Sequence, residues 1–196
     1  MRALLRSFPA ALALSFLAAC GGGDQGGQQM ADNNGAGAAA SAMAASGMPD
    51  WMTVDSAAKT VHLAIEAGKT PDNNHWNYNG HTNGDITITV PQGYAVTIAF
   101  KNDDPAMAHS LAIVPHEGPM LPATFANVEP VFAGARTSNS MDPAQATQPG
   151  RSETITFTAD QAGSYAMACE IPGHAVAGMW VGFTVSSDGT TGVSGT

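Results

Sequence analysis

The chain of 196 residues is poor in charge, in basic residues and in cysteine. Charged residues make up 12% of it, about half the average share, and 7 Lys and Arg face 16 Asp and Glu, for a net charge of −9. We therefore expect no nucleic-acid partner, because phosphate binding needs a basic face. The 2 cysteines are too few for a disulfide framework, so each needs its own explanation.

Apolar and turn-forming residues are plentiful instead. Hydrophobic residues reach 44%, and the chain has 22 Gly and 12 Pro. This composition is typical of a turn-rich globular domain and excludes a coiled coil, a collagen-like rod and a charged disordered chain. The length favours a single folded domain.

Residues 1–19 have the pattern of an export signal. Two arginines precede the apolar stretch 8–19, which is too short to span a bilayer as a mature helix. The stretch ends in Leu17-Ala18-Ala19-Cys20, which resembles the lipobox of bacterial lipoproteins. The resemblance implies cleavage before Cys20 and acylation of its sulfur, hence an exported lipoprotein anchored to a membrane, in the periplasm or at the cell surface. Ordinary cleavage after Ala19 is the alternative.

Residues 20–50 are rich in Gly, Ala, Ser, Asn and Gln and predict a lipid-anchored flexible linker. Met30, Met43 and Met48 lie in it. Thioethers can bind Cu(I), so a metal-binding role for these methionines stands beside an incidental one. Removal of the signal leaves 5 basic and 16 acidic residues, a net charge of −11.

Residues 51–187 predict an all-β domain. Apolar residues alternate with polar ones in short runs, clearest at 61–65, 86–90, 96–100 and 181–185, and Gly, Pro, Asn and Asp bound the runs. Seven to eight such strands favour an antiparallel β-sandwich.

Two regions depart from the strand pattern. The proline-rich stretch 115–150 predicts a long insertion with a short helix near 122–127. Residues 188–196 predict a disordered tail.

The second cysteine begins the motif Cys169-x4-His174-x4-Met179. Thiolate, imidazole and weak thioether are donors of a mononuclear blue copper site, which also needs a second imidazole. The alternative is that Cys169 and Met179 only fill the core.

His109 is the best second imidazole, because it shares a strand face with Leu111 and Ile113 and would point into the sandwich. Between Cys169 and Met179 we expect Pro172 and Gly173 to shape the loop, and Gly178 to permit a close turn. This loop would bring His174 to the other donors.

The loop CEIPGHAVAGM, the Asn- and aromatic-rich stretch 75–102 and the segment 131–135 resemble the sulfocyanins among the cupredoxins. The loop spacing is also similar to that of auracyanins and rusticyanins. The resemblance covers residues 59–186 and implies a Greek-key cupredoxin β-sandwich with one type 1 copper. Ser110 stands where sulfocyanins use Asn and rusticyanins use Ser, a position that helps to bind the ligand loops together.

The resemblance and the donor set predict a blue copper electron-transfer protein rather than an enzyme, a one-electron Cu(I)/Cu(II) shuttle in a respiratory-type chain. We expect His174, on an exposed loop, to be the electron port, within an apolar patch of Ala175, Val176, Ala177, Trp180 and Met120. We expect a monomer whose partners are redox proteins with a basic face, such as a cytochrome c-type donor or a terminal oxidase or reductase. An exported copper chaperone or buffer that uses the linker methionines is the alternative function.

The other histidines have simpler interpretations. His62 alternates outward from its strand, and His116 lies in the proline-rich insertion, so both predict surface positions. His75 and His81 flank an Asn-rich turn, where a second metal site stays open as a possibility.

Overall fold

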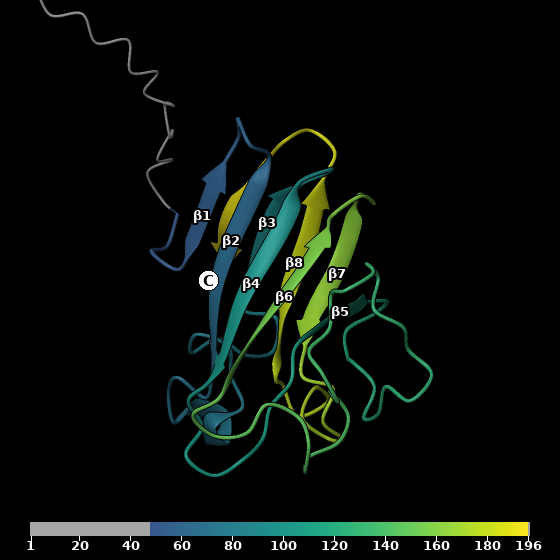
Figure 1. Ribbon diagram of the computed structural model, residues 1–196. Coiled ribbons are helices and arrows are strands. Elements are labelled where there is room, and N and C mark those ends of the chain that lie inside the picture. Colours follow the sequence, from purple (N-terminus) through teal and green to yellow (C-terminus); the bar gives the residue numbers. More distant parts are fainter. Residues whose placement is uncertain (1–47, 196) are drawn as a thin grey trace, which may run out of the picture. The chain divides into compact units, whose positions relative to one another are not determined.

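The computed structural model describes residues 48–195, so the predicted signal, the predicted acylation of Cys20 and most of the predicted linker lie outside the described residues. Within 48–195 the chain forms nine β-strands in two sheets and one short 3-10 helix (Figure 1). No helix of this part is long and apolar enough to cross a membrane.

Two mixed sheets make up the domain. The four-stranded sheet has the order β1 (Met52–Asp55), β2 (Thr60–Ala67), β4 (Ala95–Asn102), β6 (Ser152–Thr158). The five-stranded sheet has the order β5 (Ala112–Pro115), β7 (Gly163–Ala168), β8 (Trp180–Ser186), β3 (Ile86–Pro91), β9 (Gly192–Gly195). The predicted Greek-key cupredoxin β-sandwich is confirmed.

The expectation of purely antiparallel pairing was wrong. From β2 to β7 each successive strand lies in the other sheet, so several neighbours in a sheet are joined by a crossover rather than a hairpin. Crossovers permit parallel pairs, and β2 pairs with β4, and β3 with β8, in parallel.

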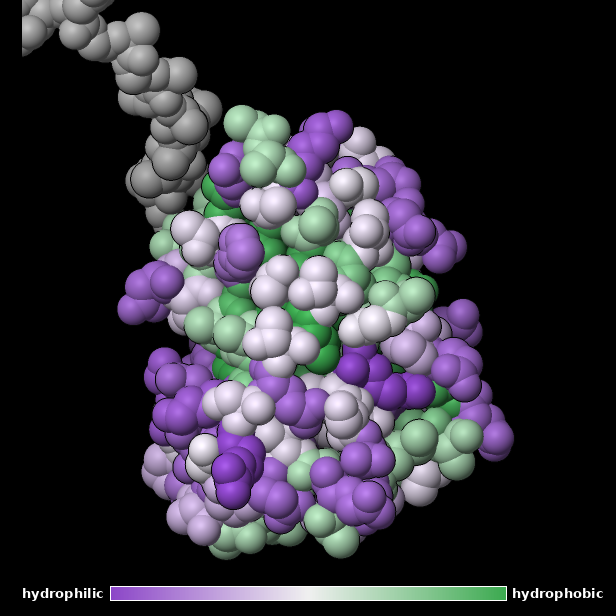
Figure 2. All heavy atoms as spheres, viewed as in Figure 1, coloured by the Kyte–Doolittle hydropathy of each residue, from purple (hydrophilic) through white to green (hydrophobic). Residues whose placement is uncertain are grey.

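The period-two pattern places the core as expected. In β2, Val61, Leu63 and Ile65 are buried while His62 is exposed, and the same alternation in β4, β6 and β8 fills the space between the sheets. Outward-facing threonines such as Thr97 and Thr156 pair across the outer side of the four-stranded sheet. Figure 2 shows pale residues with some green, hydrophobic ones between them over the middle of this face, and more purple, hydrophilic residues toward its lower end and edges.

Strand β5 is buried on both sides. Leu111 and Ile113 belong to the core between the sheets. Ala112 and Val114, on the opposite face, contribute to a second cluster with Leu121 and Phe125 of the insertion. The other members of this cluster are Ala166 and Ala168 of β7 (Gly163–Ala168) and Ala175. The insertion therefore covers the outer side of the five-stranded sheet near the strand ends that carry the site.

The helix predicted near 122–127 is absent from this part of the structure, which has only turns there. A helix of so few residues is costly to nucleate, and prolines flank the segment. Its apolar residues Leu121 and Phe125 bury against the sheet without a helix.

Both predicted domain ends differ from the structure. Residues 192–195 form β9 and pair with β3, and Val193 packs against the core, so the tail is not disordered there. Met48, predicted to lie in the linker, also packs against the core. Alternating apolar residues are too few in these short segments for their order to be visible in the sequence.

Candidate metal centre

One end of the sandwich gathers three of the predicted metal ligands. The ligand atoms of His109, Cys169 and His174 lie within 4.8 Å of one another, and all three residues are buried. The Cys169 Sγ is 3.5 Å from His174 Nδ1 and 4.0 Å from His109 Nδ1. Cys169 directly follows β7, and His109 precedes β5, which pairs with β7. Adjacent strands thus bring these donors together.

Met179 closes the same loop. Its side chain is fully buried in the cluster that contains Cys169. The Cys169 N–H donates to the Met179 carbonyl at 3.1 Å, and the Met179 N–H donates to the His174 carbonyl at 3.0 Å. Backbone hydrogen bonds therefore tie the first, middle and last predicted ligands of residues 169–179, here called the ligand loop.

The loop glycines occupy conformations that favour glycine. Gly178 has φ +102°, and a Cβ there would lie 2.5 Å from Asn83 Oδ1. Gly173 has φ +90°, and its N–H donates to the Ala123 carbonyl in the insertion. Pro172 beside it is exposed. The close turn predicted at Gly178 is therefore present.

Ser110 joins the two segments that carry ligands. Its backbone N–H donates to Cys169 Sγ at 3.4 Å, and its Oγ lies 3.6 Å from the same sulfur. The Ser110 Oγ also accepts the Glu170 N–H at 2.9 Å. Serine thus holds the ligand loop to the segment before β5 through one short side chain.

Burial raises the pKa of the Cys169 thiol to about 11, although hydrogen bonds from Ser110 act in the opposite direction. The metal-free protein therefore carries a protonated thiol at neutral pH. Because a metal binds the thiolate, binding must release that proton.

A buried carboxylate orients His109. The His109 Nε2 lies 2.8 Å from Asp104 Oδ2, and Asp104 Oδ1 accepts the N–H groups of Ala106 and Met107. Burial opposes ionisation of Asp104, but these hydrogen bonds hold its pKa below the usual value. With Nε2 engaged, Nδ1 of His109 faces Cys169, as in carboxylate–histidine–metal arrangements. Asp104 was not among the residues predicted from the sequence.

A second buried carboxylate, Glu170, was also not predicted. It follows Cys169 directly, and its Oε1 lies 2.8 Å from Arg136 Nη2. Ser140 donates its hydroxyl to the other carboxylate oxygen. Arg136 and Ser140 both belong to the insertion, so an ion pair ties the insertion to the ligand loop. Breaking such a buried pair on one side leaves an uncompensated charge.

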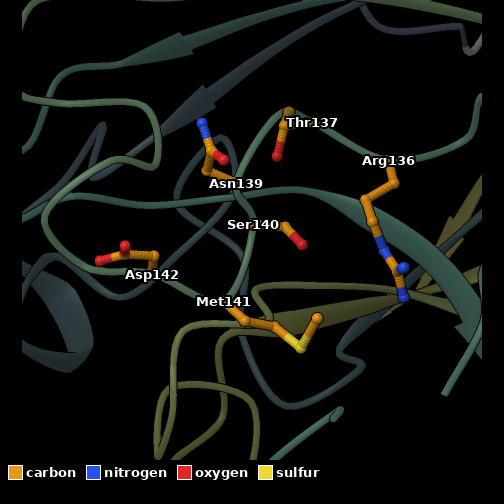
Figure 3. A pocket seen from close by; sticks show the side chains of 6 residues that line it. All are labelled: Arg136, Thr137, Asn139, Ser140, Met141 and Asp142. Carbon is orange, nitrogen blue, oxygen red and sulfur yellow. The ribbon is translucent and has the colours of Figure 1, made fainter. Parts of the chain in front are cut away.

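A pocket of about 370 Å³ lies on the insertion beside this ion pair, lined by Arg136, Thr137, Asn139, Ser140, Met141 and Asp142 (Figure 3). Most of its polar side chains are engaged within the protein. Arg136 and Ser140 bind Glu170, Thr137 accepts the Leu111 N–H, and Asp142 accepts Ala144 and Gln145. The pocket therefore offers few free polar groups to a ligand.

His174, predicted to be the electron port on an exposed loop, is itself buried. It is 3% exposed, because the Trp76 ring lies on its imidazole at 4.0 Å between centroids and 17° between planes. Of the predicted surrounding patch, Ala175 is buried, whereas Val176 and Met120 are 40% and 67% exposed. Trp76 comes from the Asn- and aromatic-rich stretch 75–102. Nothing in the sequence around it indicates that this stretch contacts the metal-binding residues.

The remaining histidines lie apart from the ligand group. His62 is exposed, as predicted. His75 Nδ1 is 3.1 Å from the Gly68 carbonyl, and His81 Nδ1 is 3.5 Å from Asp85 Oδ2. His116 stacks edge-on against Trp180. Within residues 48–195, the metal-binding group contains neither His75 nor His81.

The metal-free protein should lose stability in mild acid. Burial, with the neighbouring His109, lowers the pKa of His174 to about 4 from 6.5. Between these values the unfolded chain binds the proton and the folded chain does not, so the unfolding free energy rises with pH from 4 to 6.5. We expect a change of roughly 3 kcal/mol from this residue.

Urea unfolding of the metal-free chain at several pH values measures this dependence. His174→Gln should flatten the slope, whereas the exposed control His62→Gln should leave it as in the wild type. An equal slope in the His174→Gln variant would contradict the assignment.

Comparison with known proteins identifies the family. Residues 49–194 match the sulfocyanin (SoxE) domain. Sulfocyanin of Sulfolobus acidocaldarius is 30% identical over 138 residues, which cover 69% of this chain and 68% of that protein. Rusticyanin of Acidithiobacillus ferrooxidans is 33% identical over 129 residues, covering 65% and 77%. Among solved structures, dithionite-reduced auracyanin of Roseiflexus castenholzii aligns with a TM-score of 0.45 at 30% identity, over 64% of this chain and 96% of that one.

The chemistry of the gathered side chains agrees with this match. One buried thiol, two imidazoles and a thioether are the donors that suit a type 1 copper site. The matched domain spans nearly all of the described residues. The chain therefore belongs to the sulfocyanin family of cupredoxins, the blue copper electron-transfer proteins, and its cofactor is a single type 1 copper.

Proposed function

We propose that the protein is a one-electron carrier whose copper is held by His109, Cys169, His174 and Met179. The observation that carries the proposal is the burial of all four residues, each at most 3% exposed, at one end of the sandwich. Three of their ligand atoms lie within 4.8 Å of one another. Bound copper supplies a Cu(I)/Cu(II) couple there.

The way the four side chains are held supports a carrier rather than an enzyme. His109 is oriented by Asp104, and backbone hydrogen bonds close the ligand loop. A site fixed this way keeps its donors in place while the charge changes by one electron. Four buried donors also leave little room for a substrate beside them, and we propose no catalytic role.

The same burial weighs against the alternative of a copper chaperone or buffer. Handing a metal to a partner needs donors that the partner can reach, and these donors are covered. Met48, which was predicted to lie in the linker with Met30 and Met43, packs against the core instead. The predicted roles of Met30 and Met43 lie outside the described residues.

We also propose that the mature chain is monomeric and anchored to a membrane through lipidated Cys20, and serves a respiratory-type chain. The lipobox-like sequence before Cys20 supports the anchor. The predicted net charge of −11 supports redox partners with a basic face, because opposite charges steer such encounters.

Copper loading tests the ligand assignment. The mature chain with Cys20→Ser should bind Cu(II) and show an intense thiolate-to-copper absorption that reductant abolishes and oxidant restores. Adding Cys169→Ser should remove that absorption, because serine supplies no thiolate. Cys20→Ser alone is the matched control, since it removes the other sulfur and leaves the site intact. Equal absorption in both variants, or none in the control, would refute the assignment.

The buried charge of Asp104 should lower the reduction potential, because it stabilises the more positive oxidised site. Asp104→Asn removes that charge 2.8 Å from His109 and should raise the potential by several tens of millivolts, where about 59 mV is a tenfold change for one electron. Asp103→Asn is the matched control, because its carboxylate instead pairs with Lys101 at the surface. Voltammetry that gives equal shifts for both variants would contradict this role.

Cell fractionation tests the anchor. In a bacterial host supplied with a tagged fatty acid, the full chain should incorporate the label and sediment with membranes. The Cys20→Ala variant should do neither, because it lacks the sulfur that is acylated. A wild-type chain found unlabelled in the soluble fraction would overturn the proposal.

A further inference from the structure

We propose that electrons enter and leave the protein through Trp76, the side chain stacked on His174; the inference rests on the proposed carrier function. The two rings are 4.0 Å apart and nearly parallel, at 17°. His174 itself is only 3% exposed, whereas Trp76 is partly exposed. The outermost aromatic surface on this side of the site is therefore the indole of Trp76 and not the imidazole.

The segment that carries Trp76 is fastened to the ligand loop. Asn73 Nδ2 donates to the Ala177 carbonyl and to the Trp76 carbonyl, both at 3.0 Å. Asn77 Nδ2 donates to the carbonyls of Thr70 and Asp72. These bonds hold the indole and the imidazole in one framework, so the stack does not depend on the two rings alone.

The backbone before Trp76 adopts an unfavourable conformation. The helix η1 (Asp72–His75) contains three consecutive residues with positive φ, Asn73 at 49°, Asn74 at 57° and His75 at 64°. Each such residue costs on the order of 1 kcal/mol, and asparagine tolerates this region better than most. Strain of this kind persists where surrounding contacts fix it and often marks a functional site.

The polar end of Trp76 does not explain its position. Its Nε1 is buried, and among the residues that the structure describes it has no hydrogen-bond partner. Leaving such a donor unpaired costs about 1–3 kcal/mol, and a buried tryptophan usually finds a partner for it. The ring is therefore placed by its apolar contacts, which are its packing against the core and its stacking on His174, while its own N–H group stays unpaired.

This placement gives a short route from the site to the surface. Electron transfer slows steeply with distance, and two rings in van der Waals contact leave no gap between His174 and the indole. Val176 on the same loop is 40% exposed and adds apolar surface. A redox protein that contacts Trp76 would thus couple to His174 through a single aromatic contact, and weak redox encounters need little buried area.

Three variants of the mature, copper-loaded chain test the route. Trp76→Leu removes the aromatic ring, Trp76→Phe keeps a stacked ring, and Trp51→Leu is the matched control, since Trp51 packs against the core beside β1. The rate of electron self-exchange is read from NMR line broadening in mixtures of oxidised and reduced protein, with the visible spectrum and the potential measured alongside. We expect a several-fold fall for Trp76→Leu at unchanged spectrum and potential. Trp76→Phe should keep most of the rate, and Trp51→Leu all of it.

The metal-free chain gives a second readout that needs no electron transfer. The indole ring current should displace the His174 ring-proton resonances, and Trp76→Leu should remove that displacement. A wild-type self-exchange rate in Trp76→Leu, or a spectrum and potential that change together with the rate, overturns the inference in favour of a structural cover. If the wild-type chain shows no reversible copper redox chemistry, the proposed carrier function is refuted instead. The NMR spectra of the metal-free chain still test the stacking of Trp76 on His174 in that case.

Discussion

The burial of the Cys169 thiol is the constraint on which the rest of the site depends. In the dry interior its pKa rises to about 11, so a bound metal has to replace a proton at neutral pH. The Ser110 N–H, directed at the sulfur, favours the thiolate that remains. Burial also lowers the pKa of His174 to about 4, which keeps that imidazole neutral and ready to bind. The fold thus keeps both side chains neutral, and the Cys169 thiol loses its proton when a metal binds.

Two buried carboxylates flank this centre, and their need for partners explains how the surrounding loops are ordered. Asp104 is satisfied by His109 and two backbone N–H groups. Glu170 accepts hydrogen bonds from Arg136 and Ser140 of the insertion, which lie about 30 residues earlier in the chain. An unpaired buried charge is very costly, so the insertion is held to the ligand loop although it lacks regular structure over most of its length.

The alternation of apolar and polar residues predicted the sandwich, because it repeats along each strand. The spacing of Cys169, His174 and Met179 predicted that these residues lie together, because all three belong to one short loop. His109 also lies beside Cys169 and His174, although it precedes β5 and belongs to no named strand. Asp103 and Asp104 show what the local sequence pattern does not predict. The two residues are adjacent and identical, yet Asp103 pairs with Lys101 at the surface and Asp104 with His109 in the interior. Trp76 covers His174 from almost a hundred residues away, so no local pattern in the sequence predicts the contact.

The ligand loop is supported from several distant parts of the chain. Asn83 and Gly84 donate backbone N–H groups to the carbonyls of Gly178 and Trp180, at the end of the loop. The other end is held through Glu170, and Trp76 lies on His174 between them. These contacts restrain the donors and so oppose the different geometries that Cu(I) and Cu(II) would each choose in solution. Holding one compromise arrangement for both states keeps the rearrangement small when an electron moves, and this is what a carrier requires of its fold.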